Sequence, residues 1–404
     1  MAPCSAVRAS LYAHVPLCLS KCAYCDFFSL SLDRFPDSPG SASASSSVVA
    51  ALSIEIASRV PEWNVSRWDT VYVGGGTPSL LNPRDVSALC ASIRNSVSGD
   101  VPEEWTVEAN PEDITEEWLD ACREAGVNRL SVGVQSLNDR CRVAVGRRGS
   151  AATTLAALAL ARKRWDAAIS ADLITGLPHQ TMVSLGHDIA VLDELGCDHV
   201  SLYSLTLEEG TPLYRTVEEG RMSAVPTAMT AAMPTEDEAT ELWLHGRDEL
   251  ERRGYRQYEV SNFARAGRES AHNRVYWRMG SWIGVGPSAA GNVPDGDRST
   301  RIANATDVEA WLADPAGVQE RIGVSRKETV TETIMMGFRL REGLDRKAFV
   351  DRFGEDILDL VGETFSRWER KGLAERSPEN VYLTRDGLML LNRFLSECLD
   401  EMGD

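Results

Sequence analysis

Apolar runs recur along the first half of the chain, and each ends at a glycine, an asparagine or a loop-like segment. They predict six strands, at Leu11–Val15, Thr70–Val73, Trp105–Ala109, Arg129–Val134, Ala168–Ile174 and His199–Leu205. Because the runs are nearly continuous and do not alternate with polar residues, they are typical of strands that are buried on both faces of a parallel sheet.

Segments of helical length separate these strands, at 48–59, 83–96, 115–125, 151–165 and 181–195. Asn82 and Thr115 stand where helix N-caps are expected, and Pro83 suits the first helical position. Repeated strand–helix alternation predicts an α/β fold with helices outside a parallel sheet. The period alone does not separate a doubly wound sheet from a closed or partial barrel. The serine- and alanine-rich stretch 37–47 predicts a mobile surface insert.

The character of the chain changes after residue 324. Helical patterns at Glu328–Arg339, Arg346–Phe353 and Ile357–Lys371 precede a predicted two-strand wing at 374–384 and a last helix at 385–399. This order predicts a small α+β, winged-helix-like domain. We therefore expect three parts: a main domain at 1–253, an aromatic and glycine-rich segment at 254–323, and the C-terminal domain at 324–404.

Charge and composition narrow the class of protein. The net charge of −18 argues against a nucleic-acid partner, whose protein surfaces are basic. No apolar run approaches the roughly 20 residues of a spanning helix, and the first residues lack the apolar region of a signal peptide. Six of the nine cysteines are scattered singly, as expected of small core residues in a reducing compartment. We expect a cytoplasmic protein that could also sit at the membrane periphery.

The other three cysteines, Cys18, Cys22 and Cys25, share one short loop with the spacing C-x3-C-x2-C. Three thiolates on one loop can hold three irons of a cubic [4Fe–4S] cluster and leave the fourth iron open. The alternatives are a zinc site, which usually recruits a fourth cysteine or histidine near by, or buried thiols.

Polar residues stand at the ends of the predicted strands. Gly74-Gly75-Gly76-Thr77 follows the second strand, Glu108 ends the third and Gln135 the fourth, and Arg147 comes later. Asp172 lies inside an apolar strand, where a charge is costly unless it is paired or bound. Taken singly, each has an ordinary explanation, such as a tight turn or a surface acid. One shared ligand site at the carboxyl edge of the sheet would explain all of them together.

These motifs together resemble the radical S-adenosylmethionine (SAM) enzymes, and more narrowly the oxygen-independent coproporphyrinogen oxidase-like group with its HemW branch of heme chaperones. The resemblance covers nearly the whole chain and implies a partial (β/α)6 barrel. It also implies a [4Fe–4S] cluster on the three cysteines. In this superfamily SAM chelates the open iron, and an electron from the cluster cleaves SAM to a 5′-deoxyadenosyl radical.

The resemblance assigns further residues to SAM. Tyr12 and Tyr24 resemble residues that flank SAM and the cluster. Gly75, Gly76 and Thr77 resemble the backbone cradle for the methionine end of SAM. Glu108 resembles the carboxylate that meets the amino group of SAM. Arg147 resembles the cation for its carboxylate. Gln135 and Asp172 resemble the pair near the ribose hydroxyls, and the backbone at 204–206 the adenine edge.

Two departures favour the chaperone branch. Phe27 stands where the coproporphyrinogen dehydrogenases carry another cysteine, and Cys18 comes early, without their longer N-terminal arm. A positive sign is the H-N-x-x-Y-W motif, which the resemblance links to heme: His272, Asn273, Tyr276 and Trp277. Physically, His272 could ligate heme iron and the two aromatic rings could cover a porphyrin, although a core histidine beside buried aromatics is the ordinary alternative.

The resemblance thus implies a heme chaperone that binds heme as cargo and delivers it to acceptor proteins, some of them at membranes. The alternative is an oxygen-independent coproporphyrinogen III dehydrogenase of porphyrin biosynthesis. Catalysis is left open, and the catalytic residues with it. An electron donor such as flavodoxin or ferredoxin is implied if SAM is cleaved.

Overall fold

A single twelve-stranded sheet forms the centre of the computed structural model, which describes residues 6–36, 41–99, 101–222, 228–317 and 319–403. Seven neighbouring strands of this sheet run parallel, and they include all six strands expected from the apolar runs. They are, in sheet order, β11 (Trp282–Val285), β1 (Val7–Val15), β4 (Val65–Gly75), β5 (Glu104–Ala109), β6 (Arg129–Gln135), β7 (Ala168–Thr175) and β8 (His199–Ser204).

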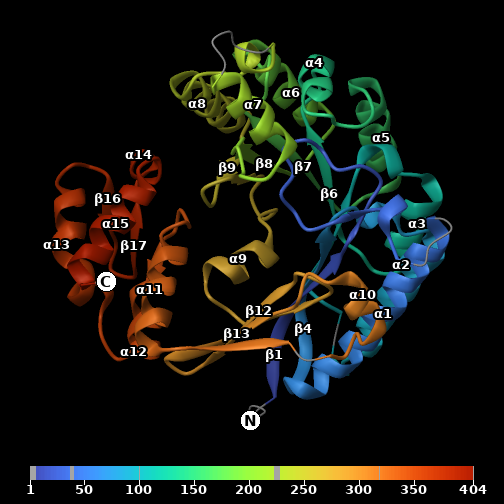
Figure 1. Ribbon diagram of the computed structural model, residues 1–404. Coiled ribbons are helices and arrows are strands. Elements are labelled where there is room, and N and C mark those ends of the chain that lie inside the picture. The colour runs from blue at the N-terminus through green and yellow to red at the C-terminus, as the bar shows by residue number, and fades with distance from the viewer. Residues whose placement is uncertain (1–5, 37–40, 100, 223–227, 318, 404) are drawn as a thin grey trace.

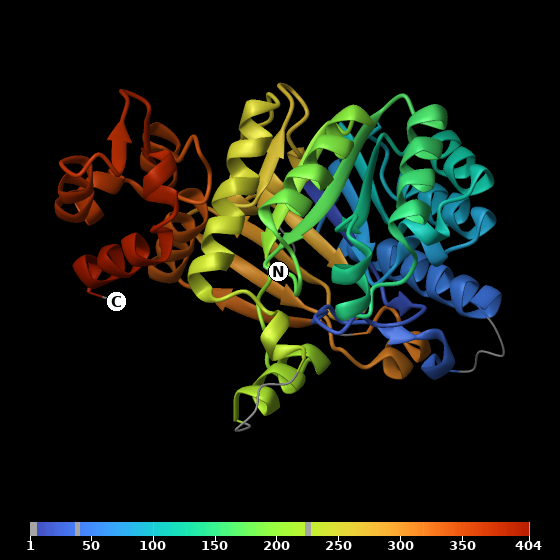
Figure 2. The same ribbon diagram turned by 90° about the horizontal axis from the view of Figure 1, so that it is seen from above.

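Helices cover the outer face of these strands, as Figures 1 and 2 show. They are α1 (Ser41–Glu62), α2 (Pro83–Asn95), α3 (Glu116–Glu124), α4 (Asp139–Ala144), α5 (Ala151–Arg164), α6 (Met182–Glu194) and α8 (Glu236–Arg252). The predicted caps are confirmed: the Asn82 side chain accepts a hydrogen bond from the Asp85 amide, and the Thr115 side chain accepts one from the Trp118 amide. The expected mobile insert is wrong for 41–47, which are helical; residues 37–40 lie outside the described residues.

The sheet is extended by short antiparallel strands at both edges. On the β11 side these are β12 (Ala290–Asp295), β13 (Arg298–Ala303) and β14 (Glu320–Val324), and on the β8 side β10 (Asn262–Ala264) and β9 (Arg256–Gln257). Pairing between described residues does not join β14 to β9, so the curved sheet is the wall of a partial barrel. The predicted α/β fold with a partial barrel is confirmed. The segment 254–323 continues the sheet of the main domain, and the three-part division stays a prediction.

Short elements decorate the barrel. They are β2 (Leu17–Cys18), β3 (Leu30–Ser31), α7 (Pro212–Met222), α9 (Ala271–Trp277) and α10 (Val308–Ala313). The α7 helix extends away from the barrel in the view of Figure 2. Its residues Leu213 and Val217 pack in a small apolar cluster with Cys141 and Val145, and Tyr24 of the cysteine loop packs against that cluster. The cysteine loop therefore has apolar support from elements distant in sequence.

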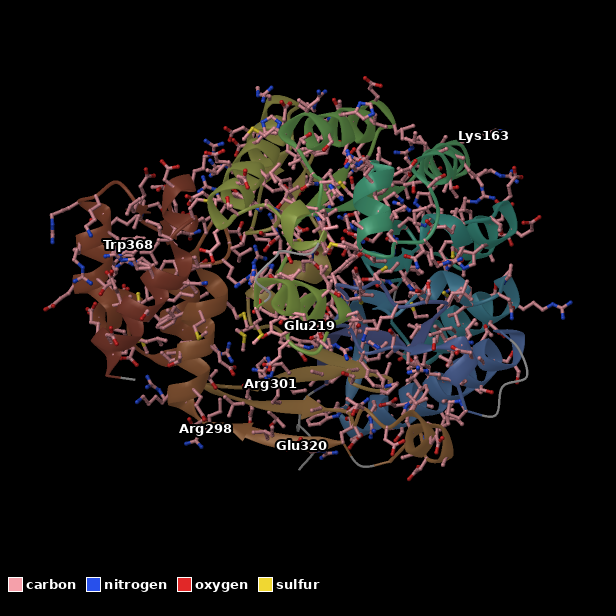
Figure 3. The ribbon with its side chains drawn as sticks, turned by 45° about the horizontal axis from the view of Figure 1, so that its top comes forward. Lys163, Glu219, Arg298, Arg301, Glu320 and Trp368 are labelled. Atoms are coloured by element: carbon pink, nitrogen blue, oxygen red, sulfur yellow. The ribbon has the colours of Figure 1, made fainter. Side chains whose placement is uncertain are left out.

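The C-terminal residues form a separate unit with its own apolar core, which includes Phe338, Phe365 and Phe394. Its elements are α11 (Arg326–Gly337), β15 (Leu344–Asp345), α12 (Arg346–Phe353), α13 (Ile357–Glu369), β16 (Ala374–Arg376), β17 (Asn380–Leu383), α14 (Arg385–Leu388) and α15 (Leu391–Met402). The expected wing, β16 and β17, gains β15 as a third strand. Figure 3 places Trp368 in this unit and Arg301 and Glu320 on the edge strands of the large sheet. Across the described residues, no helix has the length and apolar character needed to cross a membrane.

Candidate functional site

The three cysteines lie on one loop that leaves β1 at the carboxyl edge of the sheet. Cys18 ends β2, and the Cys25 amide donates to the Cys22 carbonyl oxygen at 3.1 Å. The loop is tied down where the Ala23 amide donates to the Val145 carbonyl oxygen at 3.0 Å. All three cysteines line one cavity of about 720 Å³ inside the partial barrel.

The arrangement of the sulfur atoms bears on the kind of metal site. Among the described residues, no three His, Cys, Asp or Glu side chains converge closely enough to hold a single metal ion. Thiolates on one zinc ion would stand only about 3.8 Å apart, given tetrahedral Zn–S bonds of about 2.3 Å. A cubic cluster instead takes each cysteine on a different iron, so its sulfurs are spread further. The three cysteines of this loop can supply the one thiolate per iron that such a cluster needs.

Polar donors face two of the sulfur atoms. Thr77 Oγ1 donates to Cys18 Sγ at 3.7 Å, and Arg147 Nη1 donates to Cys22 Sγ at 3.8 Å. Donors of this kind around ligand sulfurs orient the ligands and tune the metal group that they hold.

The glycine turn after β4 lies directly against the cysteine loop. Gly75 has φ = +109°, and a Cβ on it would stand 2.6 Å from the His14 ring. A Cβ on Gly76 would stand 2.4 Å from the Leu17 carbonyl oxygen, next to Cys18. Only glycine lets these two loops approach so closely.

We expect Gly76→Ala to destabilise the fold, because the added methyl group must push the Leu17–Cys18 backbone away. Overpacking of this kind costs about 1–3 kcal/mol, which urea unfolding would measure. Gly323→Ala is the matched control, since a Cβ there meets no atom within 4 Å. Equal stability of the two variants would contradict the tight contact.

Glu108 lies at the end of β5 and is held by two donors. The Tyr72 hydroxyl donates to Oε1 at 2.7 Å, and the Gly75 amide donates to Oε2 at 3.1 Å. Burial raises the pKa of Glu108 to about 7, and the Asp172 carboxylate adds to that rise. The carboxylate is thus fixed in orientation beside the glycine turn, and a positively charged or hydrogen-bonding group would favour its ionised form.

Arg147 connects the cysteine loop with two strands. Its Nη2 donates to Asn110 Oδ1 at 2.8 Å and to the Gly133 carbonyl oxygen, while Nη1 faces Cys22. Its Nε is buried without a partner. Asn110 Nδ2 in turn donates to Thr77 Oγ1 at 3.2 Å. An anionic ligand group would give this buried guanidinium a partner for its remaining donor.

Gln135 and Asp172 lie on the neighbouring strands β6 and β7. Gln135 has φ = +65° at a bulge between the two strands, an unusual conformation for a residue other than glycine. Ser131 Oγ donates to Asp172 Oδ2 at 3.4 Å. Burial raises the pKa of Asp172 to about 6, although hydrogen bonds from Ser201 and Ser131 oppose the rise.

The structure brings most of the sequence-predicted residues to one cavity. Those that line it are Cys18, Cys22, Tyr24, Cys25, Gly75, Gly76, Thr77, Glu108, Gln135, Arg147, Asp172 and Asn273, with 204–206 beside them. Tyr12 does not line it; its hydroxyl lies 2.9 Å from His14 Nδ1. Sequence reasoning missed Tyr72, Asn110 and Arg129, which also line the cavity. Arg129 lies two residues before Ser131, and Tyr72 lies four residues before Gly76; Ser131 and Gly76 also line the cavity. Side chains two or four positions apart on a strand share one face, so strand alternation was the available signal for both residues.

The other motif residues lie behind the cavity wall. His272 is completely buried, its Nδ1 lies 2.7 Å from Thr70 Oγ1 and its Nε2 lies 2.7 Å from the Tyr276 hydroxyl. Burial lowers the pKa of His272 to about 3, so the ring is neutral. The Arg339 guanidinium, two residues after the end of α11, lies 4.7 Å from the centre of the Trp277 ring. In this conformation both ring nitrogens of His272 are already used.

Comparison with known proteins agrees with this geometry. The family model of the radical SAM superfamily matches residues 12–192, and that of the HemN C-terminal domain matches residues 324–390. The heme chaperone HemW of Bacillus subtilis is 31% identical, over 97% of this chain and 100% of that protein. The chain is a radical SAM protein of the HemN/HemW type.

Two further relatives support this assignment. The mitochondrial radical S-adenosyl methionine domain-containing protein 1 of Bos taurus is 33% identical, over 98% of this chain and 88% of that protein. A solved structure of coproporphyrinogen III oxidase (HemN) from Escherichia coli superposes with a TM-score of 0.79 at 21% identity, over 97% of this chain and 90% of that one. The latter similarity concerns the fold alone.

A radical SAM domain implies a [4Fe–4S] cluster and SAM, and the cavity of this HemN/HemW-type protein fits both. Cys18, Cys22 and Cys25 face it from one loop, and each can ligate one iron. The unpartnered Nε of Arg147 and the oriented carboxylate of Glu108 offer complementary charges to the carboxylate and amino group of an amino acid.

Proposed function

We propose that this protein is a heme chaperone, which binds heme as cargo and delivers it to acceptor proteins. The observation that carries the proposal is the full-length relationship to the Bacillus subtilis protein of that name. A second observation supports it: Phe27, two residues after Cys25, is 72% exposed and lines the cavity beside the cysteine loop. An exposed aromatic ring at a cavity mouth suits contact with a flat apolar ligand.

The cysteine loop and the cavity hold the cofactors in this proposal. Cys18, Cys22 and Cys25 would each hold one iron of the cluster. Glu108 accepts from the amino group of SAM, Arg147 binds its carboxylate, and Gln135 and Asp172 hold its ribose. The cluster and SAM, when bound, supply radical chemistry if an electron donor such as flavodoxin or ferredoxin reduces the cluster. The protein's own residues orient SAM and keep water out of the site.

The heme-ligating residue is proposed to be His272, with Asn273, Tyr276 and Trp277 around it. Ligation requires α9 to move, because iron must replace one of two hydrogen bonds to the ring. Each such bond contributes only about 0.5–1.5 kcal/mol to stability. Exchange of one of them for an iron–imidazole bond therefore costs a similar amount, to which the unpacking of the buried ring from Tyr72 and Tyr276 is added.

We expect heme to bind wild-type protein with the absorption spectrum of histidine-ligated heme, and His272→Ala to lose that spectrum and at least tenfold in affinity. His245→Ala is the control. His245 lies on α8, half-buried and outside both the motif and the cavity lining, with Nε2 3.9 Å from Glu249 Oε1. Heme titrations followed by absorption measure both properties.

Weak and identical heme spectra in the wild type and in both variants would contradict the chaperone proposal. An anaerobic assay with SAM, a reductant and coproporphyrinogen III separates it from the alternative. Formation of protoporphyrinogen would identify a coproporphyrinogen dehydrogenase instead. Cytoplasmic location, including the membrane periphery, and heme-acceptor partners belong to the same proposal.

A further inference from the structure

The inner end of the cavity is lined by polar side chains where a barrel usually has packed apolar ones. Thr106, Arg129, Ser131, Ser170 and Ser201 all point inward from successive parallel strands and line the cavity. The interiors of closed (β/α)8 barrels are filled by layers of bulky branched residues. Small hydroxyl side chains in those layers leave room for a ligand that meets polar groups.

Thr106 and Arg129 are direct neighbours in this inner end. They are register partners on β5 and β6, and Tyr72 is the partner of Thr106 on β4. Thr106 is 0% exposed and Arg129 is 4% exposed. Two of their polar atoms, Thr106 Oγ1 and Arg129 Nη2, are buried without a hydrogen-bond partner. Because buried polar groups are nearly always partnered, two orphaned ones on adjacent strands indicate a group that is supplied by a ligand.

Arg129 makes its contacts within the protein through Nη1. Nη1 donates to the Arg268 carbonyl oxygen at 3.0 Å and lies 3.6 Å from Glu104 Oε2. The Glu104 carboxylate accepts three further hydrogen bonds, from Ser270 Oγ at 2.9 Å, the Ala271 amide at 2.9 Å and the His272 amide at 3.0 Å. Glu104 therefore balances part of the charge of Arg129 but does not occupy Nη2.

The other polar groups of this end are satisfied within the protein. Ser131 Oγ donates to Asp172, and Ser170 Oγ lies 2.7 Å from His199 Nδ1. What remains is the Nη2 group of Arg129 and the hydroxyl of Thr106, both able to donate, on neighbouring strands. A carboxylate has two acceptor oxygens and prefers a guanidinium partner. Thr106 lies two residues before Glu108 on β5, and Arg129 lies two residues before Ser131 on β6. At about 3.3 Å per residue, the pair lies about 7 Å further into the barrel than Glu108 and Ser131.

We propose that Arg129 and Thr106 bind a carboxylate at the inner end of the cavity, one layer below the site proposed for SAM. The carboxylate belongs either to a small free acid or to the propionate side chain of a porphyrin. The porphyrin source rests on the proposed heme function, whereas the carboxylate site does not. In both cases the bound carboxylate holds the rest of its molecule toward Glu108 and the cysteine loop.

The first experiment uses propionate and propionamide as probes on the full chain, reconstituted with cluster and SAM. Saturation-transfer NMR is expected to detect binding of propionate but not of propionamide. Arg129→Gln and Thr106→Val should each weaken propionate binding at least tenfold. Thr154→Val is the control, because Thr154 is equally buried but lies on α5, outside the cavity. Since Arg129 also supports the backbone at Arg268, the isosteric Thr106→Val variant keeps the test informative if Arg129→Gln fails to fold.

Equal binding of propionate and propionamide, or propionate binding that neither variant weakens, would overturn the proposal. The second experiment compares titrations with heme and with heme dimethyl ester. A preference for heme that disappears in Arg129→Gln supports the site and identifies the porphyrin propionate as its ligand. Equal binding of heme and ester, with propionate binding still dependent on Arg129, supports the site for a small free acid. A failure of all heme binding would contradict the chaperone function while leaving the propionate result intact.

Discussion

The Cys22→Ser variant is expected to lose the brown absorption of the iron–sulfur cluster and nearly all of its bound iron and acid-labile sulfide. The loop offers only three thiolates, and a serine hydroxyl is a poor ligand for iron in such clusters. Cys22 is the most buried of the three, and Arg147 donates to its sulfur. The loss should therefore be close to complete, as measured by absorption and by chemical analysis after anaerobic reconstitution.

Cys90→Ser provides the matched control for that experiment. Cys90 is buried on the inner side of α2, away from the cavity, so the same replacement of sulfur by oxygen tests only the effect on folding. We expect the control to keep its full cluster content. Zinc without acid-labile sulfide in the wild type, or a normal cluster in Cys22→Ser, would show that the assignment of ligands is wrong.

The barrel was predictable because its strands and caps are local features of the sequence. Apolar runs located six of the seven parallel strands and missed β11, and Asn82 and Thr115 marked the starts of α2 and α3. The start of α1 was missed because serine-rich composition suggested an unfolded insert. In the structure the residues that follow, including Val48, Val49 and Leu52, are buried in the core, and this packing outweighs the weak helix preference of serine.

The site residues were predictable where a charged residue stands in an apolar strand or at its end. Glu108 and Asp172 stood out as acids beside apolar runs, and both face the cavity. Arg129 did not stand out, because it begins a strand, where an arginine is ordinary. Its orphaned Nη2 became visible only when the register with Thr106 and the contacts of Glu104 were known.

The H-N-x-x-Y-W motif was visible in the sequence, but its role was not. The sequence pattern indicates that His272, Tyr276 and Trp277 act together, and the structure places them in contact with three different parts of the molecule. His272 bonds to Thr70 of β4, and its ring centre lies 5.2 Å from that of Tyr72. Since Tyr72 donates to Glu108, the motif also supports the carboxylate of the cavity. A pattern of residue types cannot distinguish a heme ligand from such a support, because both need a fixed imidazole.

Glu108→Gln is expected to weaken SAM binding by roughly 10- to 150-fold, which corresponds to the about 1.5–3 kcal/mol of a hydrogen bond to a charged group. The amide keeps the volume and can still accept from Tyr72, but it lacks the negative charge that meets the amino group of SAM. Equilibrium dialysis of the reconstituted protein under anaerobic conditions measures the loss. Glu103→Gln, an exposed position just before β5, should bind SAM like the wild type.

The pH dependence of SAM binding provides a second test of Glu108. Its pKa of about 7, raised by burial, means that the free protein carries a protonated carboxyl at pH 6 and a carboxylate at pH 8. SAM binding favours the carboxylate, so wild-type affinity should rise about tenfold across this interval. Glu108→Gln removes this titrating group and should leave only the roughly twofold change that Asp172, whose pKa is about 6, contributes over the same range. A similar rise in that variant would assign the proton to another group and would contradict the role proposed for Glu108.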